Sequence, residues 1–117
     1  MLKLSSPDRA PFWIDIAGGA RAQVKPVTVA AIIAARQAAA DAIKPNGEDA
    51  AFGIAAFTRS LARSGIVAWE GIGDADGKPV DPSPDNIDAL LEVLPAFDAI
   101  DRHYVVPALI GSQEKNG

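Results

Sequence analysis

Clusters of glycine and proline divide the sequence into short segments, and this division most constrains the fold. The clusters are Gly18-Gly19, Pro45-Asn46-Gly47, Gly65 and Asp76-Gly77. Glycine reaches the positive φ angles that tight turns need, and proline interrupts a continuing helix. We therefore expect every segment between two clusters to form one strand or one helix of modest length.

Two of these clusters predict hairpins. Residues 12–16 and 21–27 are β-favouring runs on either side of Gly18-Gly19, and Arg21, Gln23 and Lys25 alternate with apolar residues or proline in the second run. A Gly-Gly pair between two such runs predicts a β-hairpin at the N-terminal end. Asp76-Gly77 between short apolar segments predicts a second short hairpin near residues 66–80.

Two helices are predicted between the hairpins. Thr28 is a suitable N-cap for an alanine-rich helix that runs to residue 43, and a second helix runs from about 48 to 64 and stops at Gly65. Each carries an apolar stripe at helical spacing. The stripes are Val29, Ile32, Ile33 and Ile43 on the first helix, and Ala50, Ile54, Phe57 and Leu61 on the second.

Two further helices are predicted after residue 80. Ser83 caps the first of them with Pro84 at its first position, and Pro95 begins the last, which Pro107 should kink or shorten. Their apolar faces are Ile87, Leu90, Leu91 and Leu94, then Phe97, Ile100, Tyr104 and Ala108. The fold class predicted from these elements is α+β, with an N-terminal β-hairpin, about four helices and a second short hairpin.

The length and composition predict one domain. The chain has 117 residues, of which 49% are hydrophobic and 22% are charged, a balance typical of globular domains. We expect a single domain over residues 1–117, with 1–9 and 111–117 flexible. The chain lacks cysteine, shows no signal-peptide pattern, and has no apolar run long enough to cross a bilayer. We therefore expect a cytoplasmic protein without a membrane partner.

Charge is distributed unevenly along the chain. Residues 70–101 hold nine acids and only Lys78 as a base, whereas the chain as a whole has a net charge of −4. Binding to a phosphate backbone depends on Lys and Arg, so this composition argues against a nucleic-acid partner. The acidic segment is either a solvated face or a docking surface for a basic partner.

No pattern in the sequence predicts catalysis, a cofactor or a metal. Asp74, Asp76 and Gly77 resemble the start of a calcium loop, but Lys78 and Pro79 occupy positions that the loop needs for a ligand and for glycine. His103 is the only histidine, and no nucleophile motif accompanies it, so a histidine at the surface or at a helix end is expected. The carboxylates of the acidic segment could supply a catalytic pair, although solvation is the simpler interpretation.

Aromatic residues are the candidate protein-binding residues. Trp13 and Trp69 lie in predicted strands, where each is either a core residue or, since tryptophan is enriched at binding hot spots, a contact residue. The candidate set is Trp13, Trp69, Phe97 and Tyr104.

The C-terminal half resembles a known family. The similarity lies in Trp69-Glu70-Gly71-Ile72-Gly73-Asp74-Ala75-Asp76-Gly77-Lys78-Pro79-Val80, in residues 82–91, and in Ala96-Phe97, Tyr104, Pro107-Ala108 and Glu114-Lys115-Asn116-Gly117. These segments resemble the tail assembly chaperones of long-tailed bacteriophages, prophages and gene transfer agents. The resemblance covers about residues 60–117, while the N-terminal half agrees in outline only. None of its motifs is catalytic.

The resemblance implies a non-enzymatic assembly factor in the bacterial host cell. Such chaperones coat the tape-measure protein, keep it soluble and help to bring tail-tube subunits to it. The alternative is another small virion component, such as a head–tail joining or minor tail protein, and a small enzyme using surface carboxylates is a third class. The alanine-rich helices and a mean hydropathy of +0.11 also predict self-association through apolar helix faces.

Many members of that family are made in two lengths by a ribosomal frameshift. Glu114-Lys115-Asn116 can be encoded by GAA-AAA-AAC, which contains a slippery run of adenines, although synonymous codons would interrupt it. The residues therefore permit a longer second product without requiring one.

Overall fold

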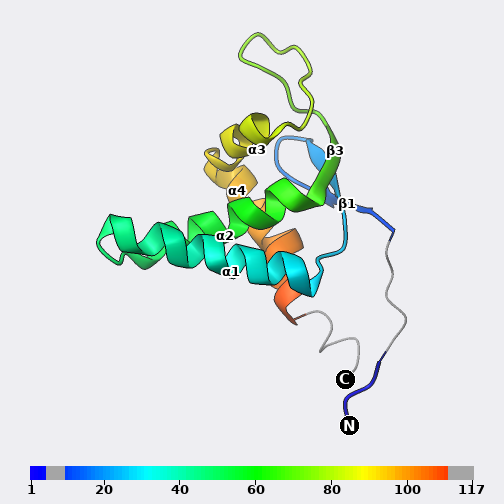
Figure 1. Ribbon diagram of the computed structural model, residues 1–117. Coiled ribbons are helices and arrows are strands. Elements are labelled where there is room, and N and C mark those ends of the chain that lie inside the picture. The colour runs from blue at the N-terminus through cyan, green and yellow to red at the C-terminus, as the bar shows by residue number, and fades with distance from the viewer. Residues whose placement is uncertain (5–9, 111–117) are drawn as a thin grey trace.

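The computed structural model describes residues 1–4 and 10–110 of the chain, which fold as an α+β domain (Figure 1). The elements are β1 Phe12–Asp15, β2 Arg21–Val24, α1 Val29–Ile43, a 3-10 turn η1 Lys44–Asn46, α2 Ala50–Gly65, β3 Ile66–Glu70, α3 Pro84–Leu91, α4 Leu94–Ile100 and a π-helical turn η2 Asp101–Val105. The predicted fold class is thereby confirmed. The predictions of flexibility at residues 5–9 and 111–117, and of a slip site at 114–116, lie outside the described residues.

The predicted N-terminal hairpin is present. β1 and β2 pair antiparallel with Ile14 opposite Ala22, and the turn between them contains Gly18 at φ 60° and Gly19 at φ 82°. Burial alternates along β2, as the sequence pattern predicts, with Ala22 and Val24 buried, whereas in β1 only Ile14 is buried.

The third strand comes from the segment predicted to begin the second hairpin. β3 pairs antiparallel with β2, which gives a sheet in the order β1-β2-β3. The second hairpin is reduced to a turn in which the Gly77 N–H donates to the Asp74 carbonyl at 2.9 Å, with a single bridge between Gly73 and Pro79. Pro79 has no N–H to extend the ladder. The strand partner of β3 is thus β2, which lies far from it in the sequence.

The helix caps follow the sequence. The Thr28 hydroxyl accepts from the Ala31 N–H at 3.1 Å, and the Ser83 hydroxyl accepts from the Asn86 N–H at 3.2 Å. The second helix, predicted to begin at about residue 48, begins two residues later at Ala50. Glu48 has a φ of 63°, outside the helical region, and the helix begins after Asp49, whose carboxylate accepts from the Ala51 N–H at 2.9 Å.

The last helix does not stop before its proline. The chain widens into the π turn η2 directly before Pro107, with the Val106 N–H bonded to the Asp101 carbonyl, and stays helical to residue 110. Of the predicted kink or shortening at Pro107, the shortening is wrong, and the helix is instead interrupted by the π turn. Proline removes one helical hydrogen bond, and a π turn is one of the ways in which a helix accommodates such a mismatch.

The core lies between the inner face of the sheet and the helices that follow it. Its most completely buried large residues include Val24 on β2, Leu61 on α2 and Ile100 on α4. Tyr104 joins three elements, because its hydroxyl donates to the Lys25 carbonyl at 2.7 Å and its ring packs directly against Gly65. The Lys25 N–H in turn donates to the Gly65 carbonyl at 2.8 Å. This junction fixes the ends of β2 and α2 against η2.

We expect Gly65→Ala to destabilise the protein, because a Cβ at this position would overlap the hydroxyl and ring of Tyr104. Overpacking of this kind typically costs about 1–3 kcal/mol. Urea unfolding followed by circular dichroism measures the change. Ser64→Ala, at the adjacent exposed position, is the control and should change the free energy of unfolding by less than about 0.5 kcal/mol. Equal effects of the two substitutions would contradict the packing assigned to Gly65.

Candidate protein-binding surfaces

Helices α1 and α2 form a hairpin whose closed end extends well beyond the sheet (Figure 1). The two helices pack closely, since a Cβ at Gly53 would come within 2.6 Å of Ile43 Cδ1. Away from this contact α1 is largely uncovered, and Ala35 is its only buried residue. Much of the apolar stripe predicted for α1 therefore faces solvent.

The exposed apolar residues of the hairpin are large. Val29 is 73% exposed, Ile33 59% and Ile54 61%. Ile54 lies three positions before Phe57 and seven before Leu61, so it points in the same direction as these two core-facing residues. The core ends before it reaches Ile54. We call Val29, Ile33, Phe52 and Ile54 the hairpin residues, and they are the main candidate contact residues for a protein partner.

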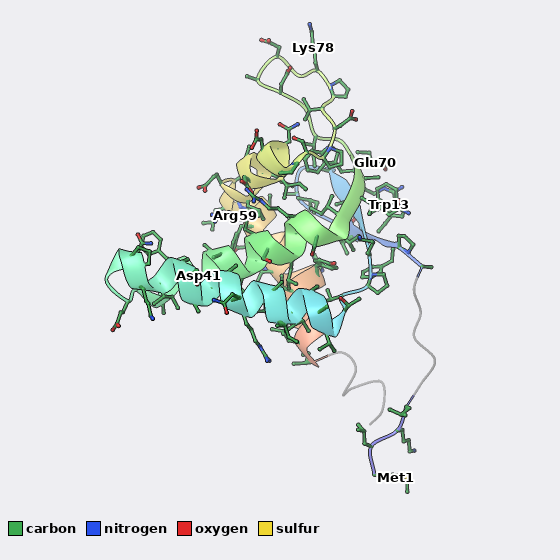
Figure 2. All side chains as sticks on the ribbon, in the orientation of Figure 1. Met1, Trp13, Asp41, Arg59, Glu70 and Lys78 are labelled. Atoms are coloured by element: carbon green, nitrogen blue, oxygen red, sulfur yellow. The ribbon has the colours of Figure 1, made fainter. Side chains whose placement is uncertain are left out.

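A shallow groove runs between the two helices. Small and charged side chains line it together; the lining residues are Ala38, Asp41, Ala42, Ala56, Arg59, Ser60, Arg63 and Ser64. Figure 2 shows Asp41 on the hairpin and Arg59 toward α3. The groove therefore combines apolar surface from small side chains with charged groups.

The arginines beside the groove tie α2 to α3. Arg63 Nε donates to Asp88 Oδ1 at 2.8 Å, Arg63 Nη2 donates to Asp88 Oδ2, and Arg59 Nε lies 3.8 Å from the same carboxylate. The hydrogen bonds from Arg63 hold the pKa of Asp88 below its usual value, and the same pairing raises the pKa of Arg63. Asp88 therefore serves the packing of α3 against α2.

The structure does not bring the four candidate aromatic residues together on one surface. Tyr104 is 3% exposed and belongs to the core, and Phe97 is partly buried against the core. Trp69 is also partly buried, and its Nε1 donates to the Val80 carbonyl at 2.6 Å. Trp13 is the most exposed of them at 40%, and it lies on the outer face of the sheet near Glu70 (Figure 2). The guanidinium of Arg21 stacks on its ring, 4.4 Å from the centroid.

The sequence-based selection missed the hairpin residues. It favoured aromatic type, and it placed Val29, Ile33 and Ile54 on apolar helix stripes without naming them as contact residues. The available signal was the alanine content of α1, because small side chains on one helix leave little apolar surface with which to cover a neighbour. Leu94, predicted on the face of the third helix, is also 68% exposed.

Most acidic residues of segment 70–101 are solvent-exposed, and so is His103, as predicted. The Asp74 carboxylate accepts hydrogen bonds from the N–H groups of Asp76 and Lys78 at 2.9 and 3.0 Å, which stabilises the turn. Within residues 1–4 and 10–110, no group of three or more His, Cys, Asp or Glu side chains is placed to hold a metal ion.

Comparisons with family models, with curated proteins and with solved structures found no match. In the part of the chain that the structure describes, no helix is both long and apolar enough to span a membrane.

We expect the Tyr104 hydroxyl to lose its proton at a higher pH than an exposed tyrosine does. Burial raises its pKa to about 12, above the value of about 10 for an unfolded chain. The neutral form is favoured in the folded state, so this contribution to stability is complete below pH 10 and is lost between about pH 10 and 12. Phenolate absorbance at 295 nm against pH measures the shift. Tyr104→Phe removes the hydrogen bond to Lys25 and should cost about 1–2 kcal/mol. A titration midpoint near 10 would contradict the burial of Tyr104.

The Asp88 pair should weaken in acid. The pKa of Asp88 is lowered in the folded state, so its contribution is present above the unfolded value of 3.8 and is lost as pH falls through the lower folded value. Asp88→Asn should therefore lower the melting temperature at neutral pH and reduce its dependence on pH below 4. Asp85→Asn, one turn away and exposed, is the control. Identical acid profiles for Asp88→Asn and the unmodified chain would contradict the pairing with Arg63.

Proposed function

We propose that this protein is a non-enzymatic tail assembly chaperone that binds a tape-measure protein and helps to recruit tail-tube subunits. The observation that carries the proposal is the exposed apolar surface of the hairpin residues, with Val29 and Ile54 both more than 60% exposed. Large apolar side chains exposed on neighbouring helices are candidates for burial against another protein. The resemblance in residues 60–117 supplies the identity of the partners.

The shape of the hairpin suits a helical client. A tape-measure protein is long, and its apolar helices need cover before the tail tube surrounds them. An amphipathic helix can lie along exposed residues at the spacing of Val29 and Ile33, which are separated by about one helical turn. α3 and the 71–80 loop carry exposed acidic residues, and this negative charge favours solubility of a complex.

The second candidate is another small virion component, such as a head–tail joining or minor tail protein. The same hairpin residues support it, because a permanent structural partner would also cover them. The two differ in fate: a chaperone leaves before the virion is complete, whereas a component stays in it. Mass spectrometry of purified particles separates the candidates.

The test is co-expression with the tape-measure protein encoded at the same locus. We expect the unmodified chain to keep that protein in the soluble fraction and to co-purify with it. Ile33→Asp and Ile54→Asp should greatly reduce the soluble yield of the tape-measure protein, because each puts a charge on the proposed contact surface. Both positions are exposed, so each change should alter stability by less than about 0.5 kcal/mol.

Leu94→Asp is the matched control, since Leu94 is 68% exposed but lies at the start of α4, away from the hairpin. It should leave the soluble yield unchanged. Equal losses with Leu94→Asp would mean that general surface apolarity, and not the hairpin, is responsible. No solubilisation by the unmodified chain would contradict the proposed function.

A further inference from the structure

Strand β1 is an edge of the sheet, and its outer side is open. The strand order β1-β2-β3 gives β1 a single strand neighbour. Ile16 bonds to the β2 side, with its N–H donating to the Ala20 carbonyl at 2.9 Å. Alternation in an antiparallel ladder then directs the backbone N–H and C=O of Trp13 and Asp15 away from β2. An edge of this kind is a template for another strand.

A row of alternating charge crosses the outer face of the sheet and ends at this edge. Asp15 is opposite Arg21, and Arg21 is opposite Glu70. Arg21 Nε donates to the Glu70 carboxylate. Asp15 forms no ion pair within the described part of the chain. The row therefore ends, at the β1 edge, in a carboxylate that a basic side chain on a fourth strand would neutralise.

The inner face of the same edge exposes apolar surface. Phe12 is 42% exposed, although its ring lies 6.3 Å from the ring of Tyr104, centroid to centroid. Ile14 is buried next to it. An added strand that fits this edge must present apolar residues inward and a basic residue outward.

The N-terminal segment has this pattern. Leu2 and Leu4 are 83% and 93% exposed, and Lys3 lies between them. In an extended strand the two leucines share one face and the lysine takes the other. With Lys3 opposite Asp15 in an antiparallel pair, Leu4 lies opposite Ile14, where it covers the inner edge beside Phe12.

We propose that residues 2–4 of one copy add as a strand to the β1 edge of a second copy, and that the exchange is reciprocal and forms a two-fold dimer. Lys3 then extends the charge row to Lys3–Asp15–Arg21–Glu70. The other edge suits this segment less well: Glu70 is already paired with Arg21, and the Trp69 indole holds Val80 alongside β3. The dimer does not depend on the chaperone function, because its surface is separate from the hairpin residues.

Disulfide trapping tests the register directly, since the chain has no cysteine. Directly opposed residues in a hydrogen-bonded antiparallel pair have Cα atoms about 5.5 Å apart, within the range of a disulfide. A mixture of Lys3→Cys and Asp15→Cys chains, mildly oxidised, should give a covalent dimer of the two variants. Because pairing raises the effective concentration of the thiols, its yield should exceed that with Glu48→Cys in place of Asp15→Cys by about tenfold or more.

Charge exchange and sedimentation complete the test. Lys3→Glu should weaken the dimer in sedimentation at graded concentrations, and the Lys3→Glu/Asp15→Lys chain should recover it. A strict monomer, a cross-link yield equal to that of the Glu48→Cys control, or no recovery in the exchanged chain would overturn the proposal. An intramolecular disulfide in a Lys3→Cys/Asp15→Cys chain would overturn it as well, since the segment would then lie on its own strand. Each result is independent of tape-measure binding.

Discussion

The contact between Tyr104 and Gly65 holds the fold together. β2 and β3 are separated in the sequence by two helices. The two strands can pair only if the end of β2 and the start of β3 are held close together. Two hydrogen bonds lie at this point. The Tyr104 hydroxyl donates to the Lys25 carbonyl, and the Lys25 N–H donates to the Gly65 carbonyl. Glycine is required there because the aromatic ring occupies the space of a side chain. The π turn that carries Tyr104 lies at the same junction.

Local features of the fold could be predicted from the sequence. Thr28 and Ser83 cap helices because a hydroxyl beside free backbone N–H groups is a short-range interaction that depends only on neighbouring residues. The Gly18-Gly19 turn is predictable for the same reason. The pairing of β3 with β2 could not be predicted in this way, since it joins two strands that are separated in the sequence by two helices. The positive φ of Glu48 was equally hidden, because glutamate has no preference for that conformation.

The candidate site could be predicted less well than the fold. Helical periodicity shows that Ile33 and Ile54 belong to apolar stripes, but it does not show whether the stripe has a partner. That depends on the size of the core, which reaches Leu61 and ends before Ile54. Aromatic type misdirected the selection toward Tyr104, whose hydroxyl and ring are used inside the domain. Exposure after folding, and not residue type before it, distinguishes a contact residue from a core residue.

The single buried residue of α1 has a consequence for how the domain opens. A helix held mainly by one neighbour and by small side chains contributes little buried apolar area, so we expect α1 to open at a lower free energy than the sheet and the C-terminal helices. Different parts of the domain then open at different free energies, with the lowest value for α1 and one of the highest for the Tyr104 junction. Any ligand that lies across α1 stabilises the least stable part of the chain first.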